Sequence, residues 1–131
     1  MSAYTHLNLK DDVEDSAQKF GMAPAMEARF AREPLELEKS GVSYLRLAPG
    51  ERAPFGHTHK EQEEVYVVVG GAGRIKLGDE IVELRRWDTL RIAPETMRNV
   101  EAGPHGIELL LFGAPNAGFG DAQTVDGWWT E

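Results

Sequence analysis

The chain has 131 residues, with 14 lysines and arginines against 22 aspartates and glutamates, 41% hydrophobic residues and no cysteine. This length favours one domain with its own core, and the missing cysteines exclude disulfides and thiolate metal sites. The net charge of −8 disfavours nucleic acids and anionic membranes as partners, because an acidic surface repels both.

Membrane insertion and secretion are also disfavoured. The longest apolar runs, residues 65–69 and 107–112, are far shorter than the roughly 18 residues of a membrane span. The first residues lack the basic and apolar regions of a signal peptide. We therefore expect a cytoplasmic protein.

Residues 1–40 are predicted to form an arm with two short helices. Apolar residues recur every three or four positions after Asp12, which is placed to cap a helix that stops at Gly21. A second helix is expected between Pro24 and Pro34, because proline suits a first helical position and ends a helical pattern.

From residue 41 to residue 113, β-type runs alternate with turn residues every eight to twelve positions or so, which is typical of a sandwich or barrel. Turns are expected at Gly70-Gly71 and at residues 102–105, among others. No connection is long enough for the crossover helix of a parallel sheet, so the strands should be antiparallel. Residues 114–131 read as a glycine-rich acidic tail. The predicted strands are residues 42–47, 64–69, 73–77, 80–84, 89–92, 97–101 and 106–112.

His57, His59 and Glu64 form the cluster most able to carry chemistry. Side chains two apart on a strand point the same way, and a turn at residues 60–63 would bring Glu64 across from the histidines. Two histidines and one carboxylate with open positions suit Fe(II), and also Mn, Ni, Cu or Zn. The alternative interpretation is a solvent-facing histidine pair beside a solvated acidic turn.

Gly50 to Gly71, with His57-Thr-His59 and then Glu64 separated from Gly71 by six residues, resembles the first motif of the cupin family. The resemblance implies an all-β double-stranded β-helix (jelly-roll) barrel at residues 41–113, behind a short helical N-terminal arm. It also implies a homodimer. Counting from Glu63 to Gly70 satisfies the same spacing, so Glu63 is the alternative metal ligand.

The second cupin motif is not kept. At its fixed positions the chain has other residues, and Arg98 stands where the family has its fourth ligand, a histidine. Arginine has no lone pair to offer a metal. Arg98 could swing away, displace the metal by pairing with Glu64, or hold a substrate carboxylate beside the metal; strand alternation favours an inward side chain over a surface one.

Other aromatic residues are weaker candidates. Tyr66 shares a face with Glu64 and could reach a ligand, and Phe55 could line the pocket mouth, although core packing explains both. Trp128 and Trp129 should dock on the barrel or on a partner subunit, because paired exposed indoles are unusual.

These features predict a small-molecule-binding cupin with a divalent metal on His57, His59 and Glu64, and with Arg98, Tyr66 and Phe55 beside the ligand. As an enzyme it would suit oxygen-dependent oxidation or isomerisation of a small carboxylate. Two alternatives stay open: a metal-free binding or sensing cupin, and metal-free catalysis with His59 as base and Tyr66 as acid. Fold resemblance alone names no reaction.

Overall fold

The computed structural model describes residues 3–131, apart from the side chain of Phe119. Within this range the chain forms a curled sheet in which every strand pair is antiparallel, as predicted. The strands are β1 (Met26–Phe30), β2 (Gly41–Leu47), β3 (Phe55–His59), β4 (Glu63–Leu77), β5 (Glu80–Arg85), β6 (Thr89–Ile92), β7 (Arg98–Ala114) and β8 (Ala122–Asp126). The helical segments are α1 (Ser16–Lys19) and the 3-10 turn η1 (Phe119–Asp121).

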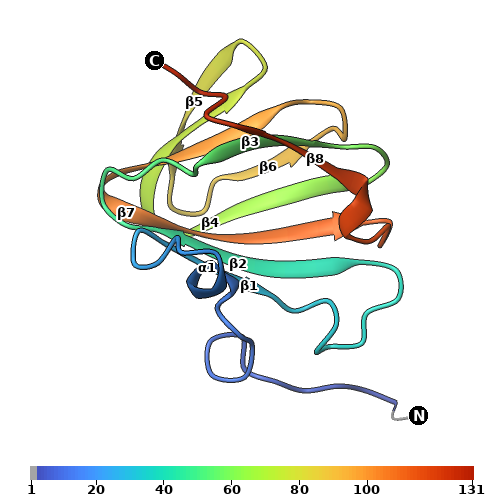
Figure 1. Ribbon diagram of the computed structural model, residues 1–131. Helices are drawn as coiled ribbons and strands as arrows, with labels where there is room; N and C mark the ends of the chain where they lie inside the picture. The colour runs from blue at the N-terminus through green and yellow to red at the C-terminus, as the bar shows by residue number, and fades with distance from the viewer. Residues whose placement is uncertain (1–2) are drawn as a thin grey trace.

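The long strands β4 and β7 connect the two layers of the barrel. The start of β7 pairs with β3, and its second half pairs with β2. Figure 1 shows β3, β6 and β8 on one side of the molecule and β1 and β2 on the other. This is the predicted double-stranded β-helix.

The turns predicted at Gly70-Gly71 and residues 102–105 are wrong: each lies inside one continuous strand. The β4–β7 register shifts at Gly71, which has a φ of 65°. A Cβ there would lie 2.1 Å from the carbonyl oxygen of Gly106. Glycine at this position therefore permits a close backbone approach and a bend within the strand. Paired glycines are also typical of turns, which is why the sequence predicted one here.

The core lies between the layers and is built from alternate residues of each strand. Val68, Ile75 and Leu109 have no exposed surface. Burying a side chain of this size contributes roughly 1.5–3 kcal/mol. The inner face of β4 and β7, which carry these residues, is therefore well packed.

The second predicted helix is wrong, because residues 26–30 form strand β1, which pairs with β2. Met26 and Phe30 are four residues apart, and this spacing puts them on one face of a helix and also on one face of a strand. The first helix exists but is only Ser16–Lys19, and its cap is Asp15 rather than Asp12. An Asp15 oxygen accepts the backbone N–H of Ala28 at 3.0 Å, which attaches the arm to β1.

The C-terminal segment packs on the barrel. Strand β8 pairs with β3 along its length, so the sheet extends beyond residue 113 as well as before residue 41. Trp129 is buried and lies under the Arg52 guanidinium, 4.2 Å from the centre of its ring. The prediction that a tryptophan of this segment docks on the barrel is confirmed for Trp129.

Glu101 on β7 joins this segment to the barrel through an ion-pair network. Arg52 and Arg74 each place a nitrogen 2.7 Å from its carboxylate. Burial raises the pKa of Glu101, but the hydrogen bonds and charges of Arg74 and Arg52 outweigh burial and leave that pKa below its ordinary value.

Glu101→Gln should lower the free energy of unfolding by about 1 kcal/mol at neutral pH. The folded-state pKa is lowered, so the stabilisation is present above the unfolded-state pKa of about 4.3 and is lost as pH falls through the folded-state value. Urea unfolding from about pH 7 to about pH 3 measures the difference. A difference that does not shrink in acid would contradict the network; Glu83→Gln, on the exposed face of β5, is the matched control.

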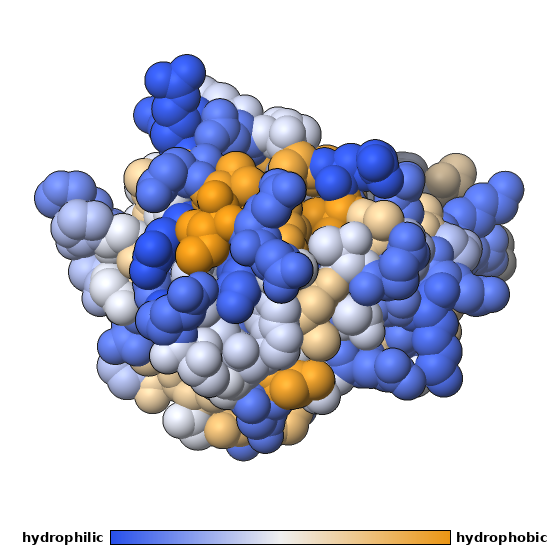
Figure 2. Space-filling view, turned by 90° about the horizontal axis from the view of Figure 1, so that it is seen from above, coloured by the Kyte–Doolittle hydropathy of each residue, from blue (hydrophilic) through white to orange (hydrophobic). Residues whose placement is uncertain are grey.

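Part of the surface is apolar. Figure 2 shows hydrophobic residues gathered in the middle of one face, with hydrophilic residues around them. Large apolar side chains with high exposure occur on β5, β7 and β8, at Ile81, Val82, Phe112 and Val125. None of the helices in the described part of the chain has the length and apolar character needed to span a membrane.

Candidate metal centre

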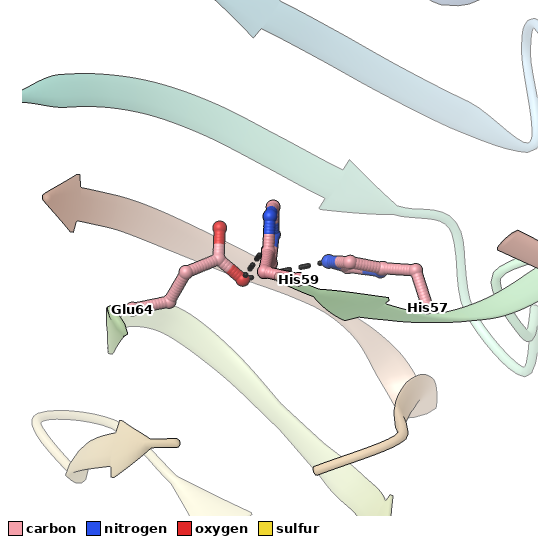
Figure 3. Close-up of side chains that lie close together, drawn as sticks. All are labelled: His57, His59 and Glu64. Atoms are coloured by element: carbon pink, nitrogen blue, oxygen red, sulfur yellow. Dashed lines mark hydrogen bonds and ion pairs between the residues drawn. The ribbon is translucent and has the colours of Figure 1, made fainter. Parts of the chain in front are cut away.

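His57 and His59 on β3 meet Glu64 at the start of β4. Their Nε2 atoms lie 3.4 Å and 3.3 Å from the same oxygen, Oε1 of Glu64. One ligand atom from each residue can be chosen so that all three lie within 4.8 Å of one another. Figure 3 shows both rings directed toward this carboxylate. Ligands about 2.1 Å from one metal ion lie roughly 3 to 4 Å apart, so the two contacts to Glu64 match a shared ion, and a small movement of the side chains would close the set around it.

Strand alternation produces this arrangement. His57 and His59 are two apart on β3 and face the barrel interior, as their spacing predicts. Of the two candidate glutamates, Glu64 is buried and meets the histidines. Glu63 is exposed on the other face, where its carboxylate lies 3.9 Å from Arg91. The structure therefore brings Glu64, and not Glu63, to the histidine pair.

Asp121 is a member of the site that sequence reasoning missed. Its Oδ2 lies 3.1 Å from Nδ1 of His59. The same carboxylate accepts the backbone N–H groups of Glu61 and Gln62 at 2.9 Å and 3.0 Å. Asp121 stands 62 residues from His59 in an acidic tail, so its spacing gives no signal, and only the pairing of β8 with β3 brings it here.

Asp121 fixes the proton of His59. Burial raises the pKa of Asp121, but the N–H groups of Gln62 and Glu61 and the contact with His59 outweigh burial and lower that pKa. An ionised carboxylate only accepts, so Nδ1 carries a hydrogen, and in the neutral ring Nε2 is then the nitrogen with the lone pair. Metal-bound histidines are held in this way by a carboxylate in many proteins.

His59 Nε2 is buried and has no hydrogen-bond partner in the described part of the chain. A buried polar atom in this state costs free energy, and such atoms call for an explanation such as a bound ion or a ligand. Nε2 lies 3.3 Å from Glu64 Oε1, and an ionised carboxylate has no hydrogen to donate to the lone pair of a neutral ring. The donor set and this orphaned atom fit a divalent cation.

Arg98 points inward, as alternation predicts. It is the direct β7 partner of His57 in the sheet register and is 1% exposed. Its Nη1 donates to Glu64 Oε1 at 2.6 Å. Of the arrangements open from the sequence, the structure shows the ion pair with Glu64.

The remaining nitrogens of Arg98 donate to backbone carbonyl oxygens. Nε donates to Thr96, and Nη2 donates to Ala93, Pro94 and Thr96, at 2.8 to 3.1 Å. All three guanidinium nitrogens therefore have partners within the protein. The role of Arg98 as an anion clamp stays a prediction, and this geometry gives it little support.

Glu64 is the centre of the cluster, and four side chains converge on Oε1. Tyr66 is buried and donates its hydroxyl to the same oxygen at 3.3 Å. Burial opposes the charge of Glu64, but the contacts with His57 and His59 outweigh burial and hold the pKa of Glu64 well below its usual range. Glu64 is therefore a carboxylate at neutral pH, which is the form that binds metal.

A cavity of about 420 Å³ opens beside the cluster and is lined by all six predicted site residues. The ring of Phe55 lies edge-on to His57, with 6.4 Å between ring centres. The cavity volume falls within the range of small-molecule sites. The lining residues predicted from the sequence are Phe55, His57, His59, Glu64, Tyr66 and Arg98.

Asp121→Asn should weaken metal binding by about 10–100-fold, the usual cost of losing the partner that orients a histidine ligand. The asparagine amide can donate to Nδ1 of His59 and move the ring proton to Nε2, which removes the lone pair. Competition with a chromophoric chelator measures the affinity. The matched control is Asp126→Asn, an exposed position at the end of β8, the strand that follows Asp121; equal affinities in both variants would contradict the role of Asp121.

Comparison with known proteins finds the same fold. No family model and no curated protein sequence matches the chain. Among solved structures, a cupin protein from Bacteroides fragilis is similar over 91% of this chain and 90% of its own, with 28% identity and a TM-score of 0.72. An uncharacterised Klebsiella pneumoniae protein with a double-stranded β-helix domain shares 19% identity over 96% of this chain and 99% of its own, with a TM-score of 0.70.

A larger enzyme shows the same likeness over part of its length. A variant of oxalate decarboxylase from Bacillus subtilis is similar to 95% of this chain, with 18% identity and a TM-score of 0.75. The chain spans only 34% of that enzyme. At this identity the likeness shows a shared fold.

Proposed function

Because the chain is a member of the cupin superfamily, by its first motif and its fold, we propose that it binds a small molecule beside a divalent metal ion held by His57, His59 and Glu64. The observation that carries this proposal is the orphaned Nε2 of His59, with its proton fixed on Nδ1 by Asp121. A metal ion would give that lone pair a partner.

The bound ion could be Fe, Mn, Ni, Cu or Zn, and it would supply Lewis-acid chemistry or, for a redox-active metal, oxygen chemistry. The residues around it have separate tasks. His57, His59 and Glu64 would hold the ion, Asp121 orients His59, and Arg98 offsets the charge of Glu64. Tyr66 keeps its proton and points it at the carboxylate.

Oxidation or isomerisation of a small substrate would suit the open positions of a three-ligand site. Oxalate decarboxylase, whose name describes action on a carboxylate, shares the fold. The sequence predicted a carboxylate substrate because Arg98 was expected to bind it. In the structure the guanidinium of Arg98 is already hydrogen-bonded to Glu64 and to the backbone. The reaction class therefore stays a proposal without a substrate assigned to it.

A metal-free binding cupin is the second candidate, and the ion pair between Arg98 and Glu64 favours it. A guanidinium 2.6 Å from Oε1 neutralises the carboxylate that a metal would need and repels a cation nearby. Metal-free catalysis with Tyr66 as acid has less support. Burial and the charge of Glu64 raise the pKa of Tyr66 well above its ordinary value, so the phenol holds its proton.

The metal content of protein purified without a histidine tag tests the proposal. After loading with each of the five metals and removal of the excess by gel filtration, the chain should keep about one equivalent of at least one of them. Retention of none would favour the metal-free binder. Assembly into a homodimer also stays a proposal, and sedimentation analysis of the same sample tests it.

A further inference from the structure

The cavity beside the metal ligands is mostly apolar. Its walls come from β1, β2, β3, β7 and β8 and from the start of β4. The apolar lining residues include Met26, Ala28, Phe30, Val42, Leu45, Ala53, Phe55, Val100, Leu111 and Ala122. The polar groups of the cluster come from β3 and from the start of β4. A ligand that fills the cavity would therefore contact hydrocarbon over most of its surface.

The cations that line the cavity in the described part of the chain already have partners. Arg98 donates to Glu64 and to backbone carbonyls. Arg32 donates to Asn116 Oδ1 at 2.6 Å and lies 3.8 Å from a carboxylate oxygen of Glu33. A carboxylate that entered this cavity would lose its hydration without gaining a new charged hydrogen bond from either arginine.

The nearby acids oppose a compact diacid. The carboxylate of Glu64 lines the cavity, and that of Asp121 lies behind His59. One carboxylate of a diacid could be balanced by a metal ion, but the second would meet apolar wall or these acidic side chains, which offer it no donor. Size points the same way: an apolar protein cavity of about 150 Å³ accepts benzene, and this one has about 420 Å³.

We propose that the cavity binds a mostly apolar, uncharged molecule about the size of a substituted aromatic ring, with one polar group directed at His57, His59 and Glu64. This assignment, which rests on the proposed function of the same site, goes beyond it in naming the ligand class. The proposed ligand class also distinguishes this cavity from a binding site for small dicarboxylates.

Calorimetric titration with matched probes tests the assignment. Benzyl alcohol and 4-ethylphenol represent the proposed class, benzoate adds a single charge to the same ring, and oxalate and succinate are compact diacids. Each probe is titrated into chelator-treated and metal-loaded wild-type protein. The uncharged rings should bind at least roughly tenfold more tightly than benzoate, and the diacids should not displace them.

Two neighbouring leucines on β7 provide the matched variants. Leu111 lines the cavity, whereas Leu110 faces the other side of the strand and does not. Leu111→Ser should weaken binding of 4-ethylphenol by about tenfold, because apolar contact is lost. Leu110→Ser should leave it within about twofold.

The outcomes separate this assignment from the proposed metal site. Preferential binding of uncharged rings to both protein samples, with no metal retained, would support the ligand class and overturn the metal. Metal retention with tighter binding of benzoate or oxalate would overturn the ligand class and leave the metal site intact. Failure of both uncharged probes to bind below about 1 mM would also overturn the ligand class.

Discussion

Arg98→Met is expected to lower the free energy of unfolding of the metal-free protein by roughly 3–5 kcal/mol. The guanidinium is 1% exposed and bonded to Glu64 at 2.6 Å. Methionine fills similar volume but leaves the carboxylate buried without its charged partner. It also removes the donors to the carbonyl oxygens of Ala93, Pro94 and Thr96.

A double-mutant cycle isolates the ion pair from these carbonyl contacts. Glu64→Gln in the Arg98→Met background removes the unpaired charge, so the double variant should be more stable than Arg98→Met alone. Denaturant unfolding of the four proteins measures the coupling. Additive effects would mean that the pair contributes nothing, and the account of Arg98 would be wrong.

Metal should partly rescue Arg98→Met, because a divalent ion on Glu64 replaces the missing positive charge. The variant should also bind metal at least about tenfold more tightly than wild type, since the cation beside the site is gone. Bound metal at about 100 times its Kd should return about 2.7 kcal/mol. A variant whose metal affinity equals that of wild type would show that Arg98 does not act on the site.

His59→Ala is expected to have the largest effect on metal binding. It removes a ligand, so the loss of affinity should exceed the 10–100-fold expected from losing its supporting partner. The metal-free variant should also lose about 1–3 kcal/mol of stability, because the hydrogen bond from Nδ1 to Asp121 is removed, so binding is compared at a temperature where both proteins are folded.

His105→Ala is the control for this variant, because His105 is exposed on β7 and does not line the cavity. Isothermal titration with Zn²⁺ and Mn²⁺ compares the three proteins. His105→Ala should match wild type within about twofold, and His59→Ala should show no saturable site. Equal binding by His59→Ala and wild type would place any metal elsewhere.

The sequence predicts the metal-ligating residues of this site better than the residues that position them. The inward direction of His57 and His59 follows from strand alternation, which is a local property. The cupin resemblance left both Glu63 and Glu64 as the carboxylate, and only the structure, in which Glu64 is buried and Glu63 exposed, separates them. The same alternation correctly predicts that Arg98 faces inward.

Long-range pairing explains what the sequence could not reveal. Asp121 reaches His59 only because β8 pairs with β3, and no periodicity encodes a contact 62 residues apart. The pattern of Met26 and Phe30 fits a helix and a strand equally well, and pairing with β2 decides between them. Gly71 lies at a bend in a continuous strand. A turn would use the same residue type, and the two differ only in whether the chain continues in the same strand or reverses direction.

Anomalous X-ray scattering from metal-loaded crystals, recorded at the absorption edge of the bound metal, tests the central claim most directly. If the site holds a metal ion, a peak is expected about 2.0–2.2 Å from Nε2 of His57, Nε2 of His59 and an oxygen of Glu64. Asp121 should remain hydrogen-bonded to Nδ1 of His59 in that structure. A well-ordered site without a peak, with Arg98 still closed on Glu64, would contradict it.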